Sequence, residues 1–143
     1  MKTRFTEKQT IPSGFPESKE EFSSLSRYFK DIGKHALLTQ DEELSISRKA
    51  LKGDLEALER LVKSNLRLVV LIAKEYRNMG LPFLDLISEG NLGLFKAAKR
   101  YDPARGTRFS TYSSYWIRQY IRRALANQSR TIRVPAYLVD RMA

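Results

Sequence analysis

Apolar residues recur every three or four positions along most of the chain, a spacing that is typical of amphipathic α-helices. The first such segment covers residues 20–32 and stops before a glycine. The second covers residues 40–52, and Thr39 with Glu42 forms a capping box at its start. The alternation of apolar and polar residues that would indicate strands does not occur. The pattern therefore predicts an all-α fold.

The longest predicted helix covers residues 55–79, with Asp54 as its N-cap and Gly80 as its stop. Pro82 takes the first position of the next predicted helix, which continues over residues 83–100. The fold expected from these segments is a compact helical bundle.

Two further helices and an arm complete the predicted elements. A helix is predicted over residues 110–127, with Ser110 or Thr111 as its N-cap, and a short last helix begins at Pro135. Residues 1–19 hold two prolines, a glycine and no apolar period, so they are expected to form a flexible arm. The length of 143 residues suits one domain with such an arm.

Two different faces divide the helix predicted over residues 110–127. At about 100° per residue, the aliphatic side chains fall on one side, expected to face the core: Ile117, Ile121, Ala124 and Leu125. Aromatic, amide and arginine side chains fall on the other side, expected to stay outside the core: Tyr112, Tyr115, Trp116, Gln119, Arg122 and Arg123. Exposed rings call for a partner, and glutamine and arginine pair well with base edges and phosphates. This face therefore favours nucleic-acid binding.

The composition narrows the class of function. The chain has no cysteine, which excludes a disulfide framework, a thiolate metal site and a cysteine nucleophile. Its single histidine, His35, cannot form a two-histidine metal motif. No catalytic constellation or phosphate-binding loop is apparent, so no enzyme activity, metal or cofactor is expected. No run of about 18 apolar residues and no signal segment stands in the sequence, which predicts a cytoplasmic protein without a membrane span.

Positive charge is concentrated in the last third of the sequence. The formal net charge is +10 at pH 7, and residues 96–143 carry eleven Lys and Arg against two Asp. The same segment holds seven of the fifteen aromatic residues. Arginine interleaved with aromatic rings is typical of a surface that grips phosphates and stacks bases. A solvated basic face with the rings in the core is the simpler alternative, and composition leaves it open.

Five segments, in this order and spacing, resemble region 2 of the bacterial RNA polymerase sigma-70 family: NLRLVV at 65–70, FLDLISEGNLGL at 83–94, RFSTY at 108–112, YWIRQ at 115–119 and RTIRVP at 130–135. Residues 24–54 resemble region 1.2, and the last nine residues resemble the start of region 3. The resemblance is to primary or general-stress members. It implies one helical domain over residues 20–134 and a truncated region 3 over 135–143, without the linker and the minus-35-reading domain.

The resemblance implies a sigma factor that binds core RNA polymerase, recognises the promoter minus-ten element and melts it by capturing bases flipped from the non-template strand. Such a protein is not an enzyme, and an anti-sigma factor is a further partner that it can have. The polymerase β′ clamp helices would be bound by six residues of the segment 81–94: Leu84, Asp85, Ile87, Ser88, Glu89 and Asn91.

The resemblance also assigns the DNA contacts. Flipped bases would be held at two positions, by Tyr101, Arg105 and Tyr112 and by Asn65, Leu68, Ser110 and Thr111. The edge of the duplex would meet Tyr115, Trp116, Gln119 and Arg122. The DNA backbone would contact Arg108, Arg118, Arg123, Arg130 and Arg133. An extended minus-ten motif would be read by Tyr137 and Asp140.

Two other classes of function stay open. A generic single-stranded nucleic-acid-binding module would use the same aromatic face but would have no use for the segment 81–94. A polymerase-binding decoy would occupy core polymerase without supporting transcription. Preference for a TATAAT-like non-template strand separates a sigma factor from the first, and transcription separates it from the second.

Overall fold

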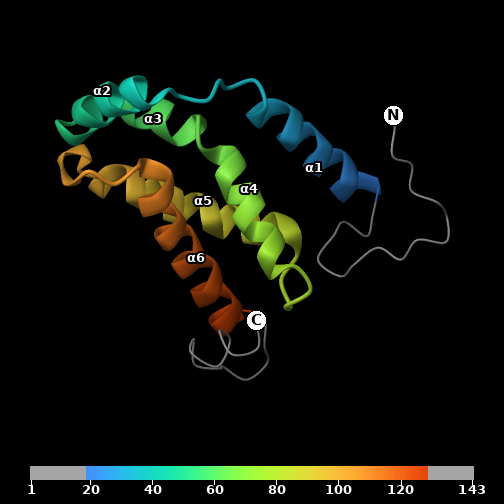
Figure 1. Ribbon diagram of the computed structural model, residues 1–143. Helices are drawn as coiled ribbons and strands as arrows, with labels where there is room; N and C mark the ends of the chain where they lie inside the picture. Colours follow the sequence, from blue (N-terminus) through green and yellow to red (C-terminus); the bar gives the residue numbers. More distant parts are fainter. Residues whose placement is uncertain (1–18, 129–143) are drawn as a thin grey trace.

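Six α-helices and two short 3₁₀ helices form residues 19–128, the part of the chain that the computed structural model describes (Figure 1). In chain order they are α1 (Lys19–Ile32), α2 (Gln40–Leu51), α3 (Leu55–Lys63), α4 (Leu66–Ala73), η1 (Lys74–Tyr76), α5 (Phe83–Arg100), η2 (Pro103–Arg105) and α6 (Phe109–Gln128). No strand occurs within these residues. The predicted all-α helical bundle is confirmed.

The central contact of the fold is the crossing of α5 and α6 (Figure 1). Gly93 lies at this crossing, where a Cβ atom would be only 2.6 Å from the carbonyl oxygen of Trp116. The side chains buried around it include Leu86, Leu94, Ile117, Ile121 and Leu125. The aliphatic face predicted for residues 110–127 is therefore confirmed as the core face of α6.

α2 and α3 lie side by side over the C-terminal end of α5, and α2 also contacts η2 (Figure 1). The predicted capping box begins α2: the Glu42 amide donates to Thr39 Oγ1 at 3.2 Å, and the Thr39 amide donates to Glu42 Oε1 at 3.0 Å. Gly53 joins the two helices with a φ of 101°, a left-handed conformation that favours glycine. The hairpin at residues 40–63 thus follows the sequence signals closely.

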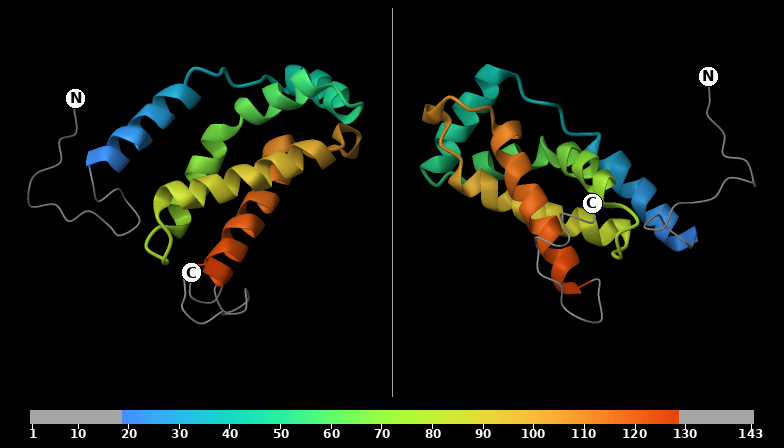
Figure 2. Two further views of the ribbon diagram at one scale, coloured as in Figure 1. Left: turned by 180° about the vertical axis from the view of Figure 1, so that it is seen from behind. Right: turned by 60° about the horizontal axis from the view of Figure 1, so that its bottom comes forward.

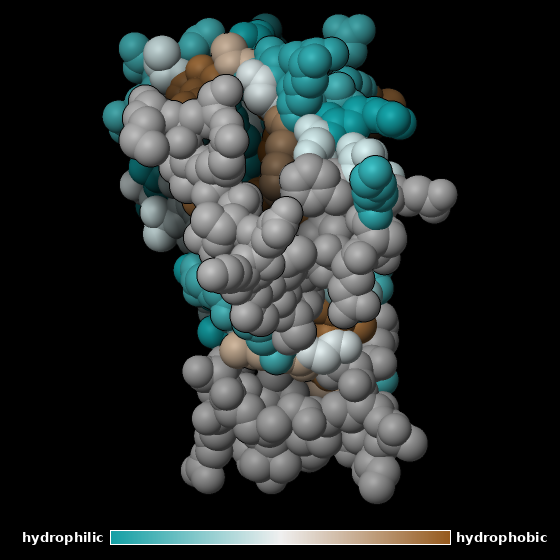
Figure 3. Space-filling model, turned by 90° about the vertical axis from the view of Figure 1, so that its right-hand side faces the viewer, coloured by the Kyte–Doolittle hydropathy of each residue, from teal (hydrophilic) through white to brown (hydrophobic). Residues whose placement is uncertain are grey.

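α1 packs on the bundle through its buried Leu25 and Ile32 and through an aromatic edge, and an extended loop separates it from α2 (Figure 2). The Tyr28 hydroxyl accepts a hydrogen bond from Asn91 Nδ2 of α5 at 3.1 Å. Phe29 meets Phe83 edge-on, with 6.5 Å between ring centroids. Seen from the α1 side, most of the coloured surface is hydrophilic, with hydrophobic residues showing between (Figure 3). The hydrogen bond and the ring contact both tie α1 to α5.

The single helix predicted over residues 55–79 is wrong, because the chain forms α3, α4 and η1 there. The break lies at Ser64 and Asn65, whose side chains bond to the preceding turn. The Ser64 hydroxyl donates to the Arg60 carbonyl at 2.8 Å, and Asn65 Nδ2 donates to the Leu61 carbonyl at 2.8 Å. Side chains that occupy these carbonyl oxygens compete with the bonds that would continue the helix. The break lets α4 turn and pack against α5 and α6 (Figure 1).

Two predicted helix starts also differ from the structure. α6 already begins at Phe109, so Ser110 and Thr111 lie in its first turn and are not its N-caps. Its first amide is capped from α2 instead, by the carboxylate of Glu43. α5 begins at Phe83, so Pro82 is the residue before the helix and not its first member.

Two sequence-based expectations fall outside the described part of the chain. These are the flexible arm, of which residues 1–18 are not described, and the helix that begins at Pro135. Lys19, which was assigned to the arm, is the first residue of α1. Between residues 19 and 128, no helix is long and apolar enough to cross a bilayer.

Candidate nucleic-acid interface

Four aromatic side chains form a cluster where α5 ends and α6 begins, called here the aromatic cluster: Tyr101, Phe109, Tyr112 and Trp116. The ring centroid of the buried Tyr101 is 5.1 Å from that of Phe109 and 5.6 Å from that of Tyr112. The Tyr112 centroid lies 6.5 Å from that of Trp116. Arg100 adds a cation at 5.4 Å from the Trp116 ring centroid. The two half-buried rings, Tyr112 and Trp116, are thus held in place by buried neighbours.

The loop between α5 and α6 is fastened to this cluster. The Tyr101 hydroxyl donates a hydrogen bond to the Thr107 carbonyl. Burial raises the pKa of this phenol, and the nearby Glu43 carboxylate raises it further. Asp102 accepts from the Ala104 amide at 3.0 Å and so caps η2. Arg105 ends η2 with an exposed side chain on this loop.

The outward side of α6 is narrower than the sequence predicts. Tyr112 and Trp116 were expected outside the core, but each is half-buried and packs against it. The expectation fails because rings and cations from the end of α5 reach across to cover them. Tyr115, Gln119 and Arg123 are exposed, Tyr115 to 71%. These three, four residues apart along one side, are called here the α6 ridge.

Glu43 joins α2 to the start of α6. Its side chain is only 8% exposed, and it accepts from Arg108 Nε at 3.1 Å and from Arg108 Nη2 at 3.3 Å. It also accepts from the Phe109 amide at 3.2 Å. Hydrogen bonding to Glu43 raises the pKa of Arg108, and the opposite charge adds to this. The guanidinium expected on DNA is therefore already paired, although Arg108 is 46% exposed. Sequence reasoning missed Glu43.

The second predicted base site spans the break before α4 and the first turn of α6. Asn65 is half-buried there, and its amide is bound to the end of α3 at 2.8 Å. Leu68 is partly buried against the core. Ser110 and Thr111 are exposed at the start of α6. The two segments belong to neighbouring helices, because α4 packs against α6.

Two arginines of α6, Arg118 and Arg122, contact η1, and the side of α6 that carries them is called here the η1 flank. Arg118 Nη2 pairs with Glu75 Oε2 at 3.2 Å. The guanidinium carbon of Arg122 lies 5.9 Å from the ring centroid of Tyr76. Burial raises the pKa of Tyr76, against which the charge of Arg122 acts. No pattern in the sequence indicates that Glu75 and Tyr76 belong to this surface.

The residues predicted to bind polymerase do not all face outward. Asp85 and Ser88 are exposed, while Leu84 and Glu89 are half-buried. Ile87 is 3% exposed and belongs to the core. Asn91 is half-buried and donates to the hydroxyl of Tyr28 in α1.

Two further residues of α5 extend its outward side. Leu92 is 55% exposed and Phe95 is 45% exposed, with Lys99 Nζ 5.2 Å from the Phe95 ring centroid. Together with Asp85 and Ser88 they recur at three- and four-residue spacing, so they share one side of the helix. This set, Asp85, Ser88, Leu92 and Phe95, is called here the α5 face. Sequence reasoning missed its apolar half, which helical spacing from Asp85 would have found.

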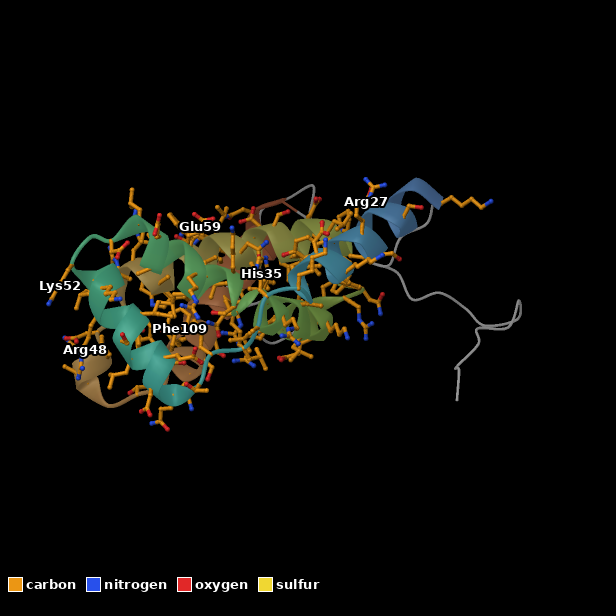
Figure 4. All side chains as sticks on the ribbon, turned by 90° about the horizontal axis from the view of Figure 1, so that it is seen from above. Arg27, His35, Arg48, Lys52, Glu59 and Phe109 are labelled. Carbon is orange, nitrogen blue, oxygen red and sulfur yellow. The ribbon has the colours of Figure 1, made fainter. Side chains whose placement is uncertain are left out.

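A hollow of about 510 Å³ lies elsewhere on the surface, between the loop after α1 and α3. It is lined by Lys34, His35, Ala36, Glu56, Glu59, Arg60, Lys63 and Ser64, two of which are labelled in Figure 4. Its charges are mixed, and Glu59 is paired with Lys63. The described residues contain no group of three or more side chains that could hold a metal ion.

Four predicted contacts lie outside the described residues: Arg130, Arg133, Tyr137 and Asp140. The residues assigned to the flipped bases and the duplex edge lie on α6, on the segment just before it, and at the start of α4, which packs against α6. The structure gives Arg108, Ile87 and Asn91 internal partners that the sequence did not indicate.

Comparisons with known proteins identify the family of the chain. A model of Sigma-70 region 2 matches residues 61–131, and a model of Sigma-70 factor, region 1.2 matches residues 23–56. The two segments together take in more than half of the chain. They follow the same order along the sequence as the segments from which the resemblance was inferred.

Curated relatives carry the same family name. The chain is 53% identical to RNA polymerase sigma factor RpoS of Coxiella burnetii over 115 residues, which is 80% of this chain and 33% of that protein. It is 53% identical to RNA polymerase sigma factor SigA of Listeria monocytogenes over 113 residues, 79% of this chain and 30% of that relative. The chain belongs to the sigma-70 family. It spans about a third of the length of these relatives.

Proposed function

We propose that this chain is the part of an RNA polymerase sigma factor that recognises the promoter minus-ten element and opens it. The relatives that it matches are named RNA polymerase sigma factors. In the proposal, this chain likewise binds core RNA polymerase and acts with it in the cytoplasm. The observation that carries the proposal is the aromatic cluster beside the α6 ridge. It combines half-exposed rings with an amide and an arginine on one side of a helix.

Base capture is the physical step that the cluster would perform. Unstacking a base from the duplex costs a few kcal/mol, and stacking on an aromatic side chain returns about 1–3 kcal/mol. The Tyr112 ring, supported by the buried Tyr101, would receive the first flipped base, with Arg105 beside it. Opening then needs no catalysis, because binding energy on the single strand offsets the unstacking.

The remaining DNA contacts follow from position along α6. A second flipped base would be held between the first turn of α6, through Ser110 and Thr111, and the start of α4, through Asn65 and Leu68. The edge of the intact duplex would meet the ridge and its flanks: Tyr115, Trp116, Gln119 and Arg122. Arg118 and Arg123 would add phosphate contacts. Arg108 would serve mainly to fix the start of α6 through Glu43, since its Nε and Nη2 atoms already bond to that carboxylate.

The α5 face is the surface that we assign to core polymerase. Exposed Leu92 and Phe95 form an apolar patch beside polar Asp85 and Ser88, a combination typical of protein-binding surfaces. Ile87 and Asn91 would support this face from inside through the core and through α1. A generic single-strand-binding module has no need for such a surface.

Replacing Tyr112 tests base capture. In Tyr112→Ala the stacking platform is lost, so affinity for a single-stranded TATAAT oligonucleotide should fall about 10- to 100-fold. Promoter opening, followed by permanganate reactivity of unpaired thymines, should be lost while binding to core polymerase stays. Tyr112→Phe keeps the ring and should retain both activities. Unchanged permanganate reactivity in Tyr112→Ala would contradict the proposal.

Charge changes at Asp85 of the α5 face and at the neighbouring Glu89 test polymerase binding. The double variant Asp85→Ala with Glu89→Lys should retain less core polymerase in a pull-down, because it removes one acid and reverses another. Asp31→Ala with Glu59→Lys makes the same change of net charge on α1 and α3 and should bind normally. Equal retention of polymerase by the two double variants would rule out the assigned face.

Base dependence separates a sigma factor from a generic single-strand binder. Each position of the minus-ten oligonucleotide is varied in turn, with and without core polymerase. We expect the largest losses at the two captured bases, about tenfold or more at each. Equal affinity for every sequence would favour the generic module.

A further inference from the structure

The two arginines on the η1 flank of α6 are held by a segment that has no assigned role in DNA binding. Arg118 and Arg122 lie four residues apart, so they project from the same flank of the helix. Glu75 pairs with the first at 3.2 Å, and the Tyr76 ring faces the second at 5.9 Å from its centroid. Both arginines are half-buried. Their partners come from another element, whereas the exposed Arg123 of the ridge lies 5.6 Å from the ring centroid of Tyr120 on α6 itself.

The position of η1 is set by the end of α4 and by the burial of Tyr76. α4 ends at Ala73, and the chain tightens into the 3₁₀ turn of residues 74–76, whose last side chain is only 4% exposed. Tyr76 therefore anchors η1 in the core. Glu75, beside it, leaves its side chain 53% exposed at the surface. A carboxylate is thus held at a set position next to the arginines of α6.

This carboxylate has a consequence for any polyanion that approaches α6. A DNA phosphate that contacts Arg118 must compete with Glu75 for the guanidinium or share it. The pair is partly exposed, and such ion pairs are weak enough in water for a phosphate to displace. When a phosphate displaces Glu75, the attraction between Arg118 and Glu75 is lost, and the phosphate is repelled by the nearby carboxylate.

We propose that Glu75 and Tyr76 are specificity-determining residues of the DNA surface: they restrain Arg118 and Arg122, and Glu75 competes with phosphate at Arg118, so that duplex of arbitrary sequence gains little from this flank. The inference rests on the proposed function. Promoter DNA has the base contacts of the aromatic cluster and the ridge in addition, so it depends less on these two cations. The restraint therefore lowers non-specific binding more than promoter binding.

A double-mutant cycle between Glu75 and Arg118 tests the proposal. The full 143-residue chain and its variants Glu75→Gln, Arg118→Gln and the double variant are titrated with two DNAs at several salt concentrations. One DNA is a fork whose single strand carries TATAAT, and the other is a random duplex of equal length. Glu59→Gln on α3 is the matched control, because it also turns a paired surface carboxylate into an amide.

Glu75→Gln should bind the random duplex about threefold more tightly, and the slope of log K against log salt should steepen by about 0.9, the value for one added phosphate contact. Affinity for the fork should rise less, so the ratio between the two DNAs should fall. In the Arg118→Gln background the same substitution should change neither affinity. Glu59→Gln should leave the ratio unchanged.

A second variant tests the other half of the restraint without disturbing the core. Tyr76→Phe keeps the buried ring beside Arg122 and removes only the hydroxyl, whose pKa the charge of Arg122 lowers. It should reduce the ratio between a fork with its matched edge base pair and a fork with that pair replaced. Its melting temperature should stay near that of the wild type.

The outcomes separate the two levels of the proposal. If Glu75→Gln acts equally with and without Arg118, or if Glu59→Gln acts alike, only the total charge matters and the restraint is refuted. An unchanged ratio in Tyr76→Phe would remove Tyr76 from it. A wild-type chain that binds fork and random duplex equally would overturn the proposed function, and this inference with it.

Discussion

At the scale of single residues, Glu43 differs from the neighbouring acids of α2 because it bonds to the start of α6. It sits in the first turn of α2, yet it accepts from both Arg108 and the Phe109 amide and is nearly buried. An acid at the first amide of α6 also suits the positive end of that helix. One carboxylate thus links the segment of region 1.2 to the helix that carries the candidate DNA surface.

Glu43→Ala should destabilise the protein by about 2–3 kcal/mol, because hydrogen bonds to charged groups contribute about 1.5–3 kcal/mol and the α6 amide loses its cap. The measurement is urea unfolding followed by circular dichroism. Asp41→Ala is the matched control in the same turn, and its exposed position predicts a change within about 0.5 kcal/mol. Equal losses in the two variants would mean that the link to α6 contributes nothing.

The sequence could have indicated Glu43, although the run of three acids at 41–43 is typical of a solvated helix start. Glu43 recurs at helical spacing with Ile46, Ser47 and Ala50, the side of α2 that faces the core. An acid on an apolar side calls for a buried partner. What no local pattern contains is the identity of that partner, since Arg108 stands 65 positions further along the chain.

At the scale of elements, helical periodicity located most helices but missed a break. Apolar residues continue at helical spacing through Val62, Leu66 and Val69, so the pattern gives no sign of the turn at residues 64–65. The break depends on side-chain bonds to carbonyls and on packing of α4 against two other helices. Periodicity records which side of a segment is buried, and it does not record a change of direction.

The crossing of α5 and α6 predicts a sharp intolerance at Gly93. In Gly93→Ala the new methyl group would lie 2.6 Å from the Trp116 carbonyl oxygen and 3.0 Å from the Ile117 Cα atom. Both are backbone atoms, so the helices must move apart at a cost of about 1–3 kcal/mol. Thermal unfolding should show a lower melting temperature, and binding to the TATAAT oligonucleotide should weaken because α6 carries the aromatic cluster.

Gly33→Ala is the control for this prediction. A methyl group there would be 3.4 Å from the nearest heavy atom, the Phe29 carbonyl oxygen, which is close to ordinary contact. Its melting temperature should stay closer to that of the wild type. Matching losses at the two glycines would mean that the close approach of α5 and α6 is not what limits Gly93.

At the scale of the whole molecule, the position of charge matters more than its amount. The net charge of +10 would attract any polyanion. In the described part of the chain, however, several cations near α6 are already engaged: Arg100 with Trp116, Arg108 with Glu43 and Arg118 with Glu75. Exposed cations also stand on other helices, such as Arg27 on α1 and Arg48 on α2 (Figure 4). The number of cations therefore overstates the number of phosphates that the DNA surface can hold.

Two matched pairs of substitutions separate position from amount. Arg105→Gln with Arg123→Gln and Arg27→Gln with Arg48→Gln each remove two exposed arginines and lower the net charge equally. Each phosphate contact on a single strand contributes about 0.7 to the slope of log K against log salt. The first pair should therefore reduce that slope by about 1.4 for a TATAAT single strand, while the second pair should leave it nearly unchanged. If both pairs reduced the slope alike, DNA would respond to the electrostatic field of the whole protein. The assignment of the single strand to the surface around α6 would then be wrong.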